Sequence, residues 1–126
     1  MNDKPIKILV IDDDITALDL VSFRFEERGY HVERAVGGVG AIEYVQEHIP
    51  DIIIVDLLMP QISGIETVKK IRAIEGASNI PIIAYTALDD AEVHQEALDA
   101  GCNEVLTKPC PQQRLVRCID RYLLDS

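Results

Sequence analysis

Short apolar runs alternate along the chain with longer stretches in which apolar residues recur every three or four positions. The runs are rich in isoleucine and valine, which favours β-strands, and the longer spacing is typical of amphipathic helices. We therefore predict five strands, at residues 6–11, 31–36, 51–56, 80–85 and 103–107. The predicted helices lie between and after them, at about residues 15–28, 39–47, 65–74, 91–100 and 112–124.

This alternation predicts a single α/β domain over residues 1–126, with a five-stranded parallel sheet and helices on both faces. Strands 6–11, 51–56 and 80–85 are almost continuously apolar, which indicates that both of their faces are buried. The segment 31–36, HVERAV, is more polar, and we expect it near an edge of the sheet. Ligands of such sheets bind at the carboxyl ends of the strands.

Four of the five predicted strands end in a side chain that can take part in chemistry. The first strand, in ILVIDDD, ends in three consecutive aspartates, and the others end in Asp56, Thr86 and Lys108. Neighbouring carboxylates repel one another unless a positive charge lies among them, and Mg²⁺ prefers oxygen ligands of this kind. We predict that Asp12, Asp13 and Asp56 bind Mg²⁺ (or Mn²⁺).

The aspartate triplet also has a purely structural interpretation, which is capping of the first helix. Asp14 is a good capping residue, and Thr16 with Asp19 matches the capping-box pattern. Because a cap needs only one acid, we assign Asp14 to the helix and keep Asp12 and Asp13 for the metal.

An aspartate can also act as a nucleophile toward phosphorus and form an aspartyl phosphate. Phosphoryl transfer depends mainly on positioning and on neutralising the oxygen charges. Lys108 offers a point charge to a phosphoryl oxygen, and Thr86 offers a hydroxyl donor.

These residues resemble the receiver domain of two-component response regulators. The matching segments are, in order, ILVIDDD, VDLLMPQISG, IPIIAYTA and TKP, and the likeness covers nearly the whole chain. The resemblance implies a flavodoxin-like fold with strand order 2-1-3-4-5, which spacing alone does not reveal. It also implies a cis peptide bond between Lys108 and Pro109.

The resemblance implies that Asp56 accepts a phosphoryl group from a phosphohistidine on a sensor histidine kinase or a histidine phosphotransfer protein. Asp13, Asp56 and the backbone carbonyl of Leu58 would bind the metal directly, and Asp12 would bind it through water. Apart from its own phosphorylation and dephosphorylation, such a domain is not an enzyme.

The resemblance further implies that Lys108 and Thr86 contact the phosphoryl group. Movement of Thr86 would then alter the surface built from residues 91–124 and so switch the binding of an output partner, which the sequence does not identify.

The sequence departs from the family pattern at several positions. Val105 replaces a frequent tyrosine or phenylalanine, so we expect Tyr85, Leu88 and the helix at 91–100 to carry the switching. Cys110 stands where phenylalanine is frequent, and we interpret it as a small apolar substitute. In this family the residues two after the aspartate and two after the threonine flank the path of the hydrolytic water. Here they are leucines, which predicts slow self-dephosphorylation.

Composition narrows the choice of partners. The formal net charge of -10 argues against direct binding of nucleic acid or an anionic membrane. No apolar run is long enough to span a bilayer. Cys102, Cys110 and Cys118 form no C-x-x-C motif, and we expect reduced thiols in a cytoplasmic protein.

Two other functions remain open at this stage. The segment ILVIDDDIT also fits the first motif of haloacid-dehalogenase-like phosphatases, with Asp12 as nucleophile and Asp14 as general acid, but that interpretation leaves Asp56 unexplained. The second is a receiver that acts as a docking module without phosphorylation. We expect no effector domain after residues 112–124, either because the receiver stands alone or because the chain is a piece of a longer regulator.

Overall fold

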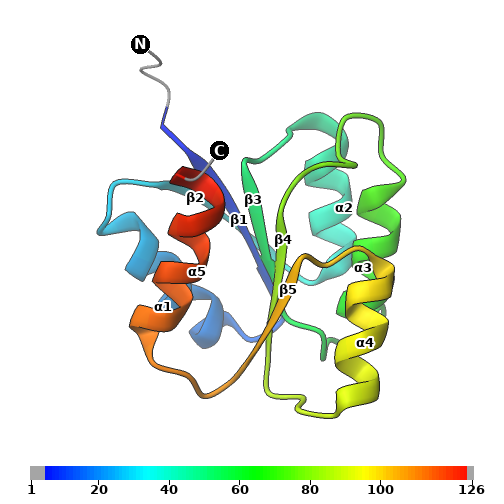
Figure 1. Cartoon of the computed structure of the whole chain (residues 1–126). Helices are drawn as coiled ribbons and strands as arrows, with labels where there is room; N and C mark the ends of the chain where they lie inside the picture. The colour runs from blue at the N-terminus through cyan, green and yellow to red at the C-terminus, as the bar shows by residue number, and fades with distance from the viewer. Residues whose placement is uncertain (1–4, 125–126) are drawn as a thin grey trace.

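The computed structural model describes residues 5–124, in which five parallel strands form one sheet flanked by five helices (Figure 1). The strands are β1 (Lys7–Asp12), β2 (His31–Val36), β3 (Ile52–Val55), β4 (Ile82–Thr86) and β5 (Glu104–Thr107). The helices are α1 (Ile15–Glu26), α2 (Gly38–Glu47), α3 (Gly64–Arg72), α4 (Ala91–Ala100) and α5 (Gln112–Leu124). The predicted domain also includes residues 1–4 and 125–126, which lie outside the described residues, so its full extent stays a prediction.

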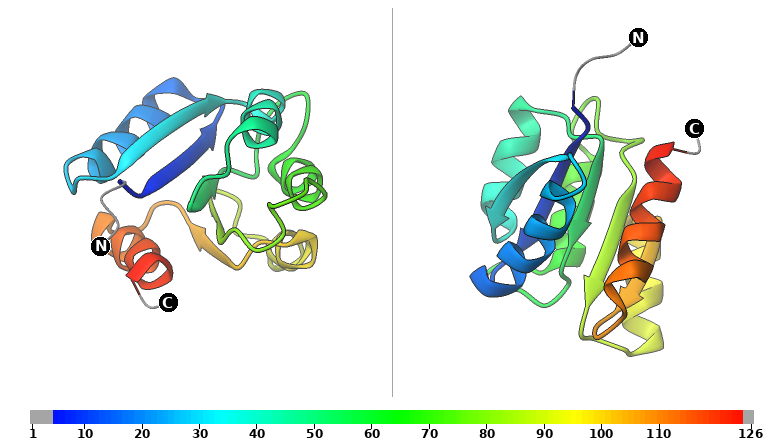
Figure 2. Two further views of the ribbon diagram at one scale, coloured as in Figure 1. Left: turned by 90° about the horizontal axis from the view of Figure 1, so that it is seen from above. Right: turned by 90° about the vertical axis from the view of Figure 1, so that its left-hand side faces the viewer.

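The strand order is β2-β1-β3-β4-β5, which confirms the order implied by the family resemblance. Helices α1 and α5 cover one face of the sheet, and α2, α3 and α4 cover the other (Figures 1 and 2). Side chains of each strand alternate between the two layers: Leu9 and Ile11 pack toward α2–α4, whereas Ile8 and Val10 pack toward α1 and α5.

Burial on both faces explains why the inner strands are almost wholly apolar. Every residue of β3 and β4 is buried, and only Lys7 of β1 is exposed. Strand β2 lies at an edge of the sheet, as expected from its polar sequence HVERAV, and only Val32 and Ala35 in it are buried.

The first helix is capped by Asp14, as predicted. Its side chain accepts hydrogen bonds from the backbone amides of Thr16 (3.0 Å) and Ala17 (3.4 Å). The alternative cap at Thr16 is wrong, because Thr16 already lies in the first helical turn and its amide is satisfied by Asp14.

Arg72, the last residue of α3, joins several loops at the amino-terminal edge of the sheet. Its guanidinium donates to the carbonyls of Gly101 (2.7 Å) and Ala77 (3.0 Å) and to Oδ1 of Asn103 (3.1 Å). The same Asn103 oxygen accepts from the amide of Ile82 at the start of β4. Gly101 has φ 125°, and a Cβ there would lie 2.8 Å from Cγ of Arg72, so both the backbone and the contact require glycine.

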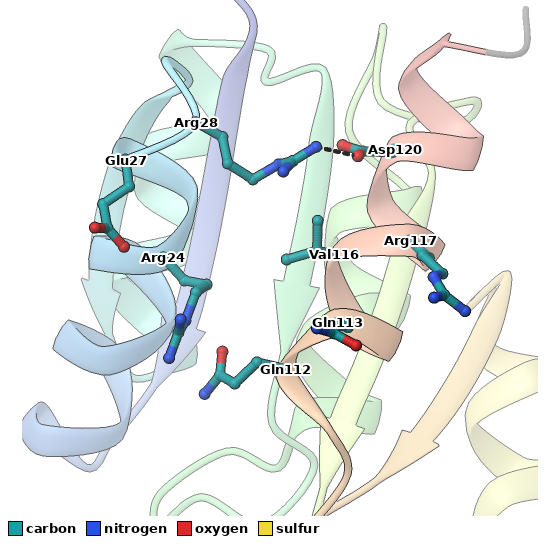
Figure 3. Close-up of a pocket in the computed structure, with 8 residues that line it drawn as sticks. All are labelled: Arg24, Glu27, Arg28, Gln112, Gln113, Val116, Arg117 and Asp120. Atoms are coloured by element: carbon teal, nitrogen blue, oxygen red, sulfur yellow. Dashed lines mark hydrogen bonds and ion pairs between the residues drawn. The ribbon is translucent and has the colours of Figure 1, made fainter.

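Asp120 of α5 connects the helices of the other layer. Its carboxylate forms an ion pair with Arg28, just after α1, and accepts a hydrogen bond from the Tyr30 hydroxyl (2.7 Å). The Arg28–Asp120 pair spans a hollow of about 490 Å³ between α1 and α5, whose base is flanked by Arg24 and Gln112 (Figure 3). This hollow lies between two helices and contains none of the predicted site residues.

We predict that Asp120→Ala lowers the free energy of unfolding by about 1–2 kcal/mol, because the partly buried Tyr30 hydroxyl loses its acceptor and Arg28 loses its ion pair. Urea denaturation would measure the change. Asp19→Ala is the control, since Asp19 pairs with Arg34 on the open surface and should cost less than about 0.5 kcal/mol. Equal losses in the two variants would contradict the prediction.

Candidate functional site

Strands β1, β3 and β5 bring Asp12, Asp56 and Lys108 to the carboxyl-terminal edge of the sheet. Asp12 is the last residue of β1. The Asp56 amide donates to the carbonyl of Ile11 (3.0 Å), and the Lys108 amide donates to the carbonyl of Thr86 (2.6 Å). Backbone hydrogen bonds to the neighbouring strand therefore fix the positions from which the three side chains start.

The Lys108 ammonium bridges the two aspartates. Its Nζ lies 3.2 Å from Oδ2 of Asp12 and 3.8 Å from Oδ2 of Asp56. The side chains of these aspartates are only 8% and 13% exposed, and carboxylates so poorly hydrated need a compensating charge. The remaining oxygens accept from backbone amides two residues further on, Asp12 from Asp14 (3.0 Å) and Asp56 from Leu58 (3.2 Å).

Lys108 reaches the two aspartates from β5, which is separated from β3 by β4. Its Nζ lies 5.1 Å from the centre of the Tyr85 ring on β4, within the range of a cation–π interaction. Burial, and secondarily the neighbouring Cys110, raises the pKa of Tyr85 above its usual value, so the ring stays neutral beneath the ammonium.

Asp12, Asp13 and Asp56 form a candidate metal site, as predicted. Each can offer one carboxylate oxygen, and these atoms all lie within 4.8 Å of one another. The ligands are all oxygen, which suits Mg²⁺ or Mn²⁺ rather than a softer ion. Three carboxylates less one ammonium leave two negative charges, and a divalent cation would balance them.

The acidic cluster lines an open hollow of about 500 Å³. Its polar part is formed by Lys108 and four aspartates (Asp12, Asp13, Asp14 and Asp56), and the apolar part includes Leu58, Met59, Pro60 and Ala87. Leu58 is 62% exposed at this rim. The hollow is large enough for an ion together with a phosphoryl group and is open to a partner that delivers one. Metal binding by the Leu58 carbonyl stays a prediction.

Thr86 is the predicted site residue whose side chain is not in the hollow. It ends β4 and is fully buried, and its Oγ1 accepts a hydrogen bond from the Leu88 amide (3.3 Å). The hydroxyl hydrogen is not used in this bond, so Thr86 can still act as a donor, but its side chain has to move toward the hollow before it can meet a group attached to Asp56.

Gly64 has a role at the site that sequence reasoning missed, because the residue was interpreted only as part of a motif. A Cβ at this position would lie 2.2 Å from the carbonyl oxygen of Asp56 and 2.6 Å from Cα of Leu57. The Gly64 amide donates to the Leu57 carbonyl (2.9 Å). Only glycine allows α3 to begin so close to the backbone of the central aspartate.

The cysteines take no part in this chemistry. Burial raises the pKa of Cys102 to about 11 and that of Cys118 to about 12, so both thiols are protonated at neutral pH and are poor nucleophiles. Cys110 follows Pro109 and packs against the α1–α5 layer, in keeping with a small apolar substitute. The peptide bond between Lys108 and Pro109 is cis, as predicted.

The fold and the acidic edge are those of a known family. The family model described as the response regulator receiver domain matches residues 8–120, and the chain belongs to this family. This match replaces the alternative of a haloacid-dehalogenase-like phosphatase. In residues 5–124 no helix combines the length and the hydrophobicity that crossing a membrane requires.

Individual relatives agree with this assignment. The chain is 36% identical over 103 residues to the DNA-binding dual master transcriptional regulator RpaA of Synechocystis; these cover 82% of the chain but 43% of that regulator. It is similar to chemotaxis protein CheY4 of Vibrio cholerae, with 32% identity, a TM-score of 0.89 and coverage of 94% and 99% of the two chains.

A third relative bears on the metal. The receiver domain of the sensor histidine kinase PA1611 from Pseudomonas aeruginosa is 28% identical, with a TM-score of 0.88 and coverage of 95% of this chain and 98% of that one. Its crystal structure has a magnesium ion coordinated in the active site cleft. Together with the oxygen cluster described above, this supports a magnesium site.

We predict that Asp13→Asn changes stability in opposite directions with and without metal. Without metal it should raise the free energy of unfolding by roughly 0.5–1 kcal/mol, because it relieves repulsion among the acids. With millimolar Mg²⁺ the wild type should gain stability from ligand binding, and the variant should gain much less. Thermal unfolding with EDTA and with MgCl₂ would measure both effects.

Asp14→Asn is the matched control, because it removes the same charge from the adjacent residue, keeps a good helix cap and leaves the cluster intact. It should retain the full Mg²⁺ effect. Equal Mg²⁺ stabilisation of wild type and Asp13→Asn would exclude Asp13 as a ligand.

Proposed function

We propose that this protein is the phospho-acceptor of a two-component system or phosphorelay, and that Asp56 receives the phosphoryl group from a phosphohistidine. The position and the surroundings of the Asp56 carboxylate support this proposal. It lies at the edge of an open hollow, within 4.8 Å of two further carboxylate ligands and 3.8 Å from the Lys108 ammonium. These are the charges that an in-line phosphoryl transfer to a carboxylate requires.

In the transfer, one oxygen of Asp56 attacks phosphorus while the phosphorus–nitrogen bond to the donor imidazole breaks. The bonding electrons leave with the imidazole, and an aspartyl phosphate forms. Lys108 exchanges its contact with Asp56 for one with a phosphoryl oxygen and keeps its contact with Asp12. Asp13, Asp56 and the Leu58 carbonyl would hold Mg²⁺, with Asp12 contributing through water, and the bound ion would neutralise the remaining oxygen charge.

Thr86 then provides the link between chemistry and output. Its hydroxyl would donate to the phosphoryl group, and the resulting change in the β4–α4 loop would alter the surface that binds a partner. This surface comprises α4, β5 and α5, in the protein or in a longer regulator that contains it.

The proposed donors are a sensor histidine kinase or a histidine phosphotransfer protein, which the family membership supports. RpaA binds DNA, but the net charge of -10 here speaks against direct nucleic acid or membrane contact by residues 1–126. We place the protein in the cytoplasm, where unpaired thiols such as Cys102 remain reduced.

The direct test is intact-mass spectrometry after incubation with acetyl phosphate and Mg²⁺. Wild type should gain one phosphoryl group, and Asp56→Asn should gain none, because an amide oxygen is a far weaker nucleophile than a carboxylate. Prior treatment with EDTA should abolish the gain. If acetyl phosphate fails, the same comparison is made with a phosphorylated histidine phosphotransfer protein.

Three results would decide between the alternatives. Phosphorylation of both Asp56→Asn and wild type would show that another residue is the acceptor. No transfer from either donor, combined with retained partner binding, would indicate a docking module. If the protein hydrolyses a phosphomonoester and Asp12→Asn abolishes this activity, the alternative of a haloacid-dehalogenase-like phosphatase would be supported instead.

We also predict a long-lived aspartyl phosphate. The Leu58 side chain lines the hollow but has no hydrogen-bonding group, and the Leu88 side chain packs against the α2–α4 layer, so neither side chain can orient a hydrolytic water. Without a phosphatase the phosphoryl group should persist for minutes or longer. Leu58→Asn should shorten its lifetime several-fold in a mass-spectrometric time course.

Leu98→Asn is the control for this experiment, because Leu98 is an exposed leucine on α4 outside the hollow. It should leave the lifetime unchanged. Loss of the group from wild type within seconds would show that the leucines do not slow hydrolysis.

A further inference from the structure

Leu88 lies in the loop between β4 and α4. Its backbone forms one hydrogen bond to a side chain earlier in the sequence and one to a side chain later in it. Its amide donates to Oγ1 of Thr86 (3.3 Å), and its carbonyl lies 2.6 Å from Nε2 of His94. One residue thus connects the buried end of β4 with the first turn of α4. Figure 1 shows the loop between these two elements.

The chemistry of the partners fixes the direction of the second bond. A backbone carbonyl can only accept, so Nε2 of His94 must carry the hydrogen and donate it. Both the neutral tautomer protonated at Nε2 and the imidazolium can do so. His94 therefore acts as a hydrogen-bond donor that holds Leu88.

The position of Thr86 makes this connection sensitive to the state of Asp56. Thr86 is fully buried and its side chain does not line the hollow. Rotation of the Thr86 side chain toward a group on Asp56 would move Oγ1, and this movement would alter the hydrogen bond that Oγ1 accepts from the Leu88 amide. The Leu88 backbone then has to find a new arrangement, and its carbonyl is already bound to α4 through His94.

The other contacts between this loop, β5 and α4 are made by aliphatic side chains. Leu88, Val93 and Val105 are all partly buried and pack against the same core layer. These aliphatic contacts lack direction, whereas the two hydrogen bonds of Leu88 are specific in geometry.

We propose that His94 is a positioning residue that transmits the state of Thr86 to α4 through the Leu88 backbone. This inference rests on the proposed function, since it requires Thr86 to respond to a phosphoryl group on Asp56.

The test is ¹H–¹⁵N NMR of uniformly labelled protein with Mg²⁺, before and after addition of beryllofluoride, a phosphoryl mimic. In wild type, amide shifts should change both around Asp13, Asp56 and Lys108 and along residues 91–100. In His94→Ala the changes at the site should remain, whereas those along residues 91–100 should fall to less than half. A purely structural role would lower the melting temperature without separating the two sets of shifts.

Two matched variants sharpen the result. His94→Gln places an Nε2 donor the same number of bonds from Cα and should restore much of the α4 response. Gln95→Ala changes the next residue, which bonds only to Asp99 on the exposed face, and should behave as wild type. If alanine at position 94 prevents folding, His94→Leu keeps the side-chain volume without a donor and should give the same loss.

Each remaining outcome is decisive. A full α4 response in His94→Ala or His94→Leu, with normal shifts at the site, would overturn the role of His94 and leave the proposed function intact. No response at Asp13, Asp56 or Lys108 in wild type would instead overturn the proposed function and this inference with it.

Discussion

The carboxyl-terminal edge of this sheet depends on a single ammonium group. Lys108 crosses from β5 over the Tyr85 ring and bridges two poorly hydrated carboxylates that belong to β1 and β3. The strand order places β1 and β3 side by side, so their terminal aspartates are forced together whether or not their charges favour it. The lysine relieves part of this repulsion. The negative charge that remains favours binding of a cation and allows Lys108 to exchange one partner for another.

The rest of the site is built around that charge arrangement by close backbone contacts. Gly64 lets α3 start against the backbone of Asp56, and the carboxylates of Asp12 and Asp56 each accept from the amide two residues further on. These turns leave Asp13 exposed and keep the hollow open. Backbone contacts thus hold the aspartates on the side of the protein, and the open hollow leaves them accessible on the other side. This arrangement suits Asp56, which another protein must reach.

Much of this arrangement could be predicted from the sequence, and the failures have physical reasons. Residue periodicity located every helix and strand to within two residues, because burial on both faces leaves the inner strands continuously apolar. Periodicity could not order the strands; the family motifs did. The choice between Asp14 and Thr16 as cap depended on where the backbone enters the helix. The contact between His94 and Leu88 could not be predicted, because its acceptor is a backbone carbonyl. Every residue has such a carbonyl, so the pattern of residue types does not indicate it.

At the opposite, amino-terminal edge of the sheet, the guanidinium of Arg72 holds the loops in place. It gathers the loops before β4 and after α4 onto one planar donor, with Gly101 pressed against its side chain. Because several hydrogen bonds to one side chain hold these loops together, we expect them to keep their positions when the acidic edge changes. A dye or tether attached near residues 76–78 would therefore report the orientation of the whole protein while remaining silent about its signalling state.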